Sequence, residues 1–141
     1  MTMRAAAAVL SVLALSCVYA CKSQSRPRAQ LHALFDLPCQ QTVSVAETPL
    51  QITFTKLISD SRCPAGMTCV WAGEVVVELK VTSGTESVSI ELGTHRTRQR
   101  EVTALGYRIM LEDLSPHRSM QDRVEQSQYS VSLKVTPASQ G

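Results

Sequence analysis

Two cysteines lie close together in the segment Ser59–Gly73, which reads SDSRCPAGMTCVWAG. Cys63 and Cys69 are separated by five residues, among which are Pro64 and Gly66, and both of these residue types favour chain reversal. In an oxidising compartment the two thiols would close a small loop as a disulfide. A loop of this length constrains the unfolded chain less than a long one does, so we expect the bridge mainly to fix local shape.

Three interpretations of this segment remain open at the sequence level. In the first, Trp71, the only tryptophan of the chain, packs over the disulfide in the core, while Asp60 and Arg62 pair with each other or with the backbone. In the second, the bridged loop is a recognition site made of Asp60, Arg62, Met67 and Trp71. Arg62 and Met67 would then lie at its rigid tip. In the third, Met67 and the two reduced cysteines capture monovalent copper, which prefers soft sulfur ligands.

A second group of candidate residues is the arginine-rich stretch Gly93–Arg100, which reads GTHRTRQR. Arg96, Arg98 and Arg100 carry guanidinium groups, whose fork of donors suits carboxylates and phosphates. The stretch therefore predicts either a contact with an anionic surface, such as lipid head groups or glycan, or a solvated hairpin loop.

The sequence offers no motif that supports catalysis. It contains no Gly-x-Ser-x-Gly, no His-Glu-x-x-His and no phosphate-binding glycine loop. His117 follows Pro116 near Glu112 and Asp113, which is typical of an exposed turn. A zinc site needs about four ligands, and the other histidines are scattered. We therefore expect a protein that is not an enzyme and that has no cofactor and no metal.

Alternation of apolar and polar residues dominates the chain from Val43 onward, as expected for half-buried strands. Thr82–Thr85 is a turn signal between two such runs and predicts a hairpin. The predicted inward residues are Leu50, Ile52, Phe54, Val75, Val77, Leu79, Val81, Val88, Ile90, Leu92, Tyr107, Ile109, Leu111, Tyr129, Val131, Leu133 and Val135, with Val76 predicted to face outward. About seven such strands predict an all-β fold, either a small antiparallel sandwich or a partly open barrel.

The N-terminal residues 1–20 have the layout of a secretory signal peptide, because a short basic start precedes a run rich in alanine. Val18 and Ala20 precede Cys21 in a pattern that resembles the lipobox of bacterial lipoproteins, in which the cysteine is lipidated and becomes the new N-terminus. Cys17 is the alternative lipidation site. Lys22 after the cysteine implies retention in the outer membrane, facing either the periplasm or the surface.

An ordinary signal peptidase would instead cleave after Ala20 and release a soluble protein with four cysteines, in which Cys21 would pair with Cys39. Lipidation of Cys21 would leave Cys39 as a buried free thiol. We favour lipidation, because the polar residues that follow are typical of a tether. The predicted organisation is a signal peptide at 1–20, a flexible tether at 21–36, the β domain at 37–137 and a disordered tail at 138–141.

The whole chain has 14 lysine and arginine residues against 12 acidic residues, which argues against a nucleic-acid-binding protein. With 141 residues it is long enough for one domain with its own core.

The stretch Asp60-Ser61-Arg62-Cys63-Pro64, followed by Cys69-Val70-Trp71-Ala72-Gly73, resembles an uncharacterised family of short bacterial secreted proteins and lipoproteins. The resemblance covers about residues 37 to 136 and implies no activity. We therefore expect a lipoprotein that is anchored in the membrane by its N-terminal lipid and acts as a binding or structural module, with an envelope protein or glycan as partner. The alternatives are a soluble secreted or periplasmic inhibitor or sensor, and a periplasmic copper-handling protein.

Overall fold

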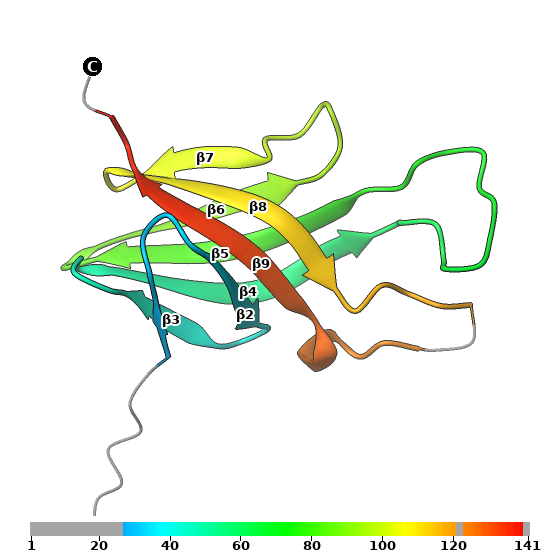
Figure 1. The fold of residues 1–141 in the computed structure, drawn as a ribbon, viewed down its shortest axis with the longest axis horizontal. Helices are drawn as coiled ribbons and strands as arrows, with labels where there is room; N and C mark the ends of the chain where they lie inside the picture. The colour runs from blue at the N-terminus through cyan, green and yellow to red at the C-terminus, as the bar shows by residue number, and fades with distance from the viewer. Residues whose placement is uncertain (1–26, 121–122, 140–141) are drawn as a thin grey trace, which may run out of the picture.

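The computed structural model describes residues 27–120 and 123–139, which form two facing β-sheets (Figure 1). The five-stranded sheet has the order β1-β3-β4-β5-β6 and the four-stranded sheet the order β2-β9-β8-β7. The strands are β1 (Arg28–Ala29), β2 (Leu34–Pro38), β3 (Thr42–Val45), β4 (Leu50–Asp60), β5 (Val75–Ser83), β6 (Glu86–Gly93), β7 (Glu101–Ala104), β8 (Tyr107–Ser115) and β9 (Ser130–Pro137), with one 3-10 turn at Gln126–Gln128. All neighbours are antiparallel except β1 and β3. The predicted all-β sandwich is confirmed, and the sheets do not close into a barrel.

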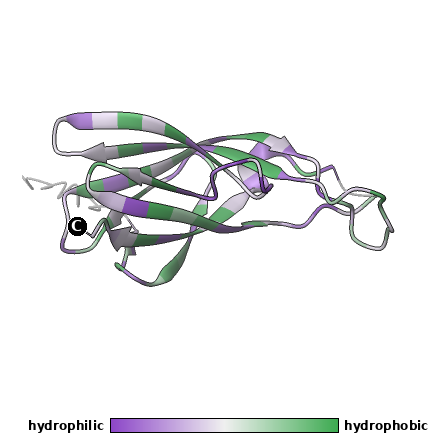
Figure 2. Ribbon diagram, turned by 90° about the horizontal axis from the view of Figure 1, so that it is seen from above, coloured by the Kyte–Doolittle hydropathy of each residue, from purple (hydrophilic) through white to green (hydrophobic). Residues whose placement is uncertain are grey.

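The core lies between the two sheets and is made by alternate residues of the long strands. Figure 2 shows this alternation as green and purple bands along the strands. The fully buried predicted residues include Leu50, Ile52, Phe54, Val77, Leu79, Val81, Ile109, Leu111, Val131, Leu133 and Val135. Their burial confirms that the period of two in the sequence marks the inner faces.

Two predicted orientations are wrong. Val76 was expected to face solvent, but it is buried because residues 94–100 fold back over the outer side of β5 and β6. Thr94 N donates to Val75 O at 3.1 Å, which holds this loop in place. Val88 was expected to face inward, but it is exposed because it lies in the first half of the edge strand β6, where the exposed residues gather.

The predicted tether is wrong for its second part, because the domain begins before residue 37. Ala29 in β1 is buried in the core, and its carbonyl accepts a hydrogen bond from Ala46 N at 2.8 Å. β2 adds Leu34–Pro38 to the edge of the second sheet beside β9. Both strands are too short to show a clear alternation in the sequence.

At the other end of the chain, β9 ends at Pro137, and Ala138 N still donates to Gly106 O at 2.9 Å. The predicted tail is therefore held at its first residue. The signal peptide, residues 21–26 and the last two residues lie outside the described residues, and so do Cys17 and Cys21.

The longest hairpin of the molecule is formed by β4 and β5, which are paired as far as Asp60 and Val75. It carries the loop 61–74, which protrudes from one end of the sandwich (Figure 1). The loop between β8 and β9 lies at this same end, whereas the first described residues lie towards the other end (Figures 1 and 2). Among the described residues, no helix is long and apolar enough to cross a membrane.

Candidate functional site

The loop 61–74 is closed at its base by hydrogen bonds between its first and last residues. Ser61 N donates to Glu74 O at 2.8 Å, and Glu74 N donates to Ser61 Oγ at 2.9 Å. Next to them, Gly73 packs against the Ser61 backbone so closely that a Cβ atom at Gly73 would lie 1.7 Å from Ser61 O. The two chain segments can meet only because residue 73 has no side chain.

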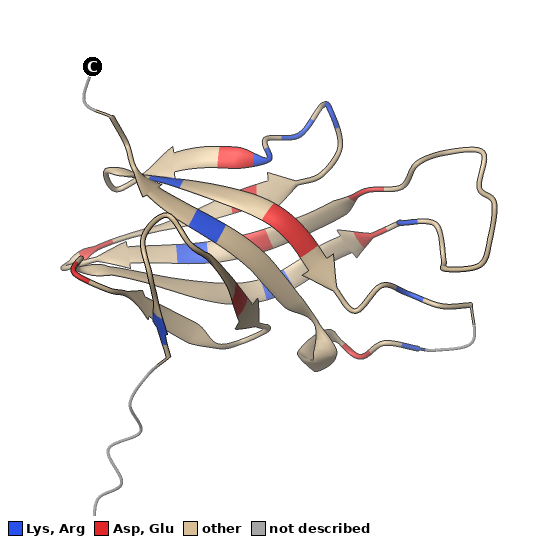
Figure 3. Cartoon of the chain, viewed as in Figure 1, with Lys and Arg blue, Asp and Glu red and all other residues tan. Residues whose placement is uncertain are grey.

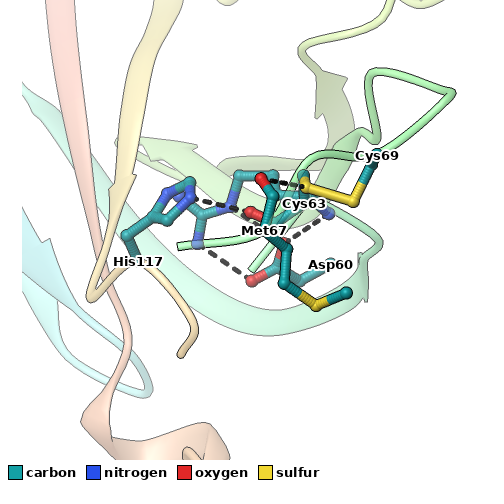
Figure 4. Close-up of a disulfide and its surroundings, with 6 residues drawn as sticks. Asp60, Cys63, Met67, Cys69 and His117 are labelled. Atoms are coloured by element: carbon teal, nitrogen blue, oxygen red, sulfur yellow. Dashed lines mark hydrogen bonds and ion pairs between the residues drawn. A yellow bond between two sulfur atoms is a disulfide. The ribbon is translucent and has the colours of Figure 1, made fainter. Parts of the chain in front are cut away.

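The predicted disulfide between Cys63 and Cys69 is present, with 5.9 Å between the two Cα atoms (Figure 4). Between the cysteines the chain turns at Gly66, which has a φ of 84°. Met67 N donates to Pro64 O at 3.2 Å within this turn. Because the two sulfur atoms are bonded to each other, the ligand set of the copper hypothesis is not assembled in this structure.

Asp60 and Arg62 form an ion pair at the base of the loop. Arg62 Nε lies 2.9 Å from Asp60 Oδ1, and Arg62 Nη2 lies 2.9 Å from Asp60 Oδ2, so the pair is bidentate. Their side chains are only 12% and 3% exposed, respectively. Arg62 also donates to Leu114 O at 2.6 Å and to Pro116 O at 3.0 Å. The expected pairing is present, but it places Arg62 beneath the loop instead of at its tip.

The loop between β8 and β9 supports the disulfide loop from the side. Arg118 Nη1 donates to Asp60 O at 2.7 Å, and Ala65 N donates to Arg118 O at 2.9 Å. His117 Nε2 lies 3.0 Å from Cys63 O, as Figure 4 shows, while the residue stays exposed as predicted. The first half of the disulfide loop is thus fixed to a neighbouring loop.

The electrostatics of the base follow from these contacts. Burial by itself would raise the pKa of Asp60, but the hydrogen bonds from Arg62 and the positive charges of Arg62 and Arg118 outweigh burial and lower that pKa. The hydrogen bond to Asp60 raises the pKa of Arg62 in turn. Burial, followed by the negative charge of Asp60, raises the pKa of Tyr129, whose hydroxyl donates to Asp60 Oδ2 at 3.4 Å.

We predict that Asp60 makes the fold sensitive to acid. Its pKa in the folded state lies below the unfolded value of about 3.9, so the ionised carboxylate stabilises the fold at neutral pH. That contribution is lost as the pH falls below about 4 and through the folded-state pKa. Urea unfolding between about pH 5 and about pH 2.5 should therefore show a larger loss of stability in the native protein than in Asp60→Asn.

The matched control for this experiment is Asp113→Asn. Asp113 also faces Arg62, at 3.9 Å, but its side chain is 77% exposed. This variant should keep the acid sensitivity of the native protein. Equal losses of stability in acid for the native protein and Asp60→Asn would contradict the assignment.

The tip of the loop is apolar and faces solvent. Val70 is 92% exposed and Trp71 is 83% exposed, while Met67 and, from the neighbouring loop, Met120 are exposed as well. The interpretation in which Trp71 packs in the core is therefore wrong. The loop 61–74, to which Trp71 belongs, extends beyond the sandwich, so no opposing sheet is available to bury its side chains (Figure 1).

Two further properties distinguish this tip. No residue from Cys63 to Gly73 carries a charge, and Figure 3 shows the outer part of the loop without acidic or basic residues, between Arg62 and Glu74. Among the described residues, the backbone N–H and C=O groups of residues 68–72 take part in no hydrogen bond. The tip thus presents apolar side chains together with unpaired main-chain groups.

The three predicted arginines do not form one cluster that is available to a ligand, because two of them have partners within the protein. Arg98 lies 3.7 Å from Glu74, and Arg100 donates to Leu111 O at 2.8 Å and to Glu112 O at 2.7 Å. Within residues 27–120 and 123–139, only Arg96 of the three has no ion pair. An anionic contact at this loop stays a prediction.

Cys39 is a buried free thiol in this structure, and burial raises its pKa. Its predicted alternative partner, Cys21, lies outside the described residues.

Val70 and Met120 belong to this exposed apolar surface, although the sequence does not single them out. The sequence does carry a signal for Val70, because this residue lies beside Trp71 in a run without charge. Met120 had no local signal, since only the packing of the two loops places it at this end.

Comparison with family models, with curated proteins and with solved structures finds no match for this chain.

Proposed function

We propose that the protein is a non-catalytic binding module of the bacterial envelope, anchored through a lipid on Cys21, and that the tip formed by Met67, Val70 and Trp71 is its recognition surface. The observation that carries the proposal is the exposure of Trp71 on a loop that a disulfide and a bidentate ion pair hold in place. Tryptophan is enriched among the residues that dominate binding energy at interfaces.

The bracing of the loop supports recognition because a fixed loop loses little conformational entropy when it binds. The bracing lies at the base of the loop and between the cysteines, whereas Val70 and Trp71 follow the second cysteine and are exposed. The sandwich therefore acts as a scaffold, and the loop presents the contact surface.

The position of the tip fits a lipid anchor at the N-terminus. The chain enters the domain at residue 27, towards the end opposite to the loop (Figure 1). A lipid on Cys21 would hold that end at the membrane and leave the tip accessible to a partner, such as an envelope protein or a glycan.

The experiment that tests the anchor is an intact mass of the protein expressed with its own leader in a bacterial host. We expect a species that begins at Cys21, carries acyl chains and gains two hydrogens on reduction of Cys63–Cys69. It should sediment with membranes, and Cys21→Ser should release it, while the control Cys17→Ser should not. An unacylated species that gains four hydrogens would overturn the anchor and support a soluble secreted protein.

We predict that Trp71→Ala leaves the free energy of unfolding within about 0.5 kcal/mol of the native value, because the side chain is almost fully exposed. As the only tryptophan, Trp71 also reports on its own surroundings. Its fluorescence in the native protein should be quenched by acrylamide nearly as well as in the unfolded chain. A protected, blue-shifted emission would show that Trp71 is covered.

A further inference from the structure

The shape and chemistry of the tip narrow the class of partner. The loop 61–74 protrudes from the end of the sandwich (Figure 1), and its largest side chain, Trp71, is exposed next to Val70 on a segment without charge. An exposed apolar side chain gains most when it enters a concave apolar pocket, where it loses its whole contact with water. The partner therefore needs a deep apolar pocket that holds an indole ring.

The main chain of the tip favours a protein as the partner over a lipid bilayer. The backbone groups of residues 68–72 have no hydrogen-bond partner among the described residues. Such groups are costly to place in hydrocarbon, which cannot pair with them. A protein cleft can pair with them, so the free main chain favours a cleft that binds a peptide backbone.

Serine peptidases of the chymotrypsin type have a substrate cleft with both features. Its primary pocket is a hydrophobic slot, and groups that bind a peptide main chain lie beside this pocket. The disulfide between Cys63 and Cys69 and the contact of Ala65 with Arg118 keep the loop from adapting freely to such a cleft. A loop held in this way can occupy the cleft and block it.

We infer that residues 68–72 occupy the substrate cleft of a serine peptidase with a deep apolar primary pocket, with Trp71 in that pocket, and that the protein inhibits the peptidase by occupancy. This inference rests on the proposed function, because it assigns a partner class to the same tip. Inhibition needs no covalent step.

The test measures the hydrolysis of small chromogenic substrates by chymotrypsin and by trypsin, with increasing amounts of the purified mature protein. We expect competitive inhibition of chymotrypsin and none of trypsin, whose pocket carries a carboxylate. Trp71→Ala should weaken the inhibition of chymotrypsin by at least about 30-fold, as expected for a dominant interface residue.

The variant Trp71→Lys gives the sharper result, because it should transfer inhibition from chymotrypsin to trypsin. Trp71 is exposed, so both variants should keep the native circular dichroism spectrum. The matched control is Leu34→Lys, which changes an exposed apolar residue of β2, away from the loops of the site, and should leave inhibition of chymotrypsin within about threefold of the native value.

Three results would overturn the inference: no inhibition of chymotrypsin, rapid cleavage of the loop as an ordinary substrate, or inhibition that is unchanged in Trp71→Ala. A blue shift of Trp71 fluorescence with phosphatidylcholine vesicles and without peptidase inhibition would place the tip in a bilayer. In each of these cases the proposed lipid anchor is judged separately, by the intact mass.

Discussion

Replacing Arg62 by methionine should lower the free energy of unfolding by about 3–5 kcal/mol, which is typical when one partner of a buried ion pair is removed. The substitution leaves Asp60, whose side chain is only 3% exposed, without its bidentate partner. It also removes the donors to Leu114 O and Pro116 O, which join the disulfide loop to the loop after β8. Urea unfolding at neutral pH measures the loss.

The matched control is Arg98→Met, because Arg98 also forms an ion pair, with Glu74, but its side chain is 48% exposed. An exposed pair contributes little, so we expect a change below about 1 kcal/mol. The double variant Asp60→Asn, Arg62→Met should lose less free energy of unfolding than the two single variants lose together, since it leaves no buried charge without a partner. A loss for Arg62→Met as small as that for Arg98→Met would show that the buried pair does not hold the base.

The substitution Gly73→Ala should destabilise the protein by about 3 kcal/mol, at the upper end for overpacking. The new Cβ atom would lie 1.7 Å from the backbone oxygen of Ser61 and 2.6 Å from Arg62 N. Because the clashing atoms belong to the backbone, they cannot move aside as the end of a flexible side chain can. The two ends of the loop must therefore separate. The hydrogen bonds between Ser61 and Glu74 are then lost as well.

The control for this prediction is Gly66→Ala in the same loop. Gly66 has a φ of 84°, and a Cβ atom there would meet no atom within 4 Å. Its substitution costs only the backbone strain, which is about 1 kcal/mol. Thermal unfolding of the two variants should therefore separate a clash from strain. If Gly66→Ala is as destabilising as Gly73→Ala, close approach of the Ser61 backbone is not the reason for glycine at position 73.

The sequence by itself determined the class of fold and the faces of the long strands. Alternation over runs such as Leu50 to Phe54 and Val131 to Val135 is a local property, and a sheet has only two faces, so the period of two was enough to identify the core. The disulfide was predictable for a similar reason, since Cys63 and Cys69 are near neighbours in the chain and the residues between them favour a turn.

Only the tertiary structure decided which residues of the disulfide loop are accessible. An apolar residue such as Trp71 is buried only if another element lies opposite to it, and Trp71 is exposed. The loop that joins β4 and β5 protrudes past the end of the sandwich (Figure 1). Arg62 is held below the tip by carbonyl oxygens of Leu114 and Pro116, more than fifty positions away in the chain. Val76 is buried by a loop that folds back over its strand. Local patterns carry no information on such long-range contacts, and these contacts set the chemistry of the tip.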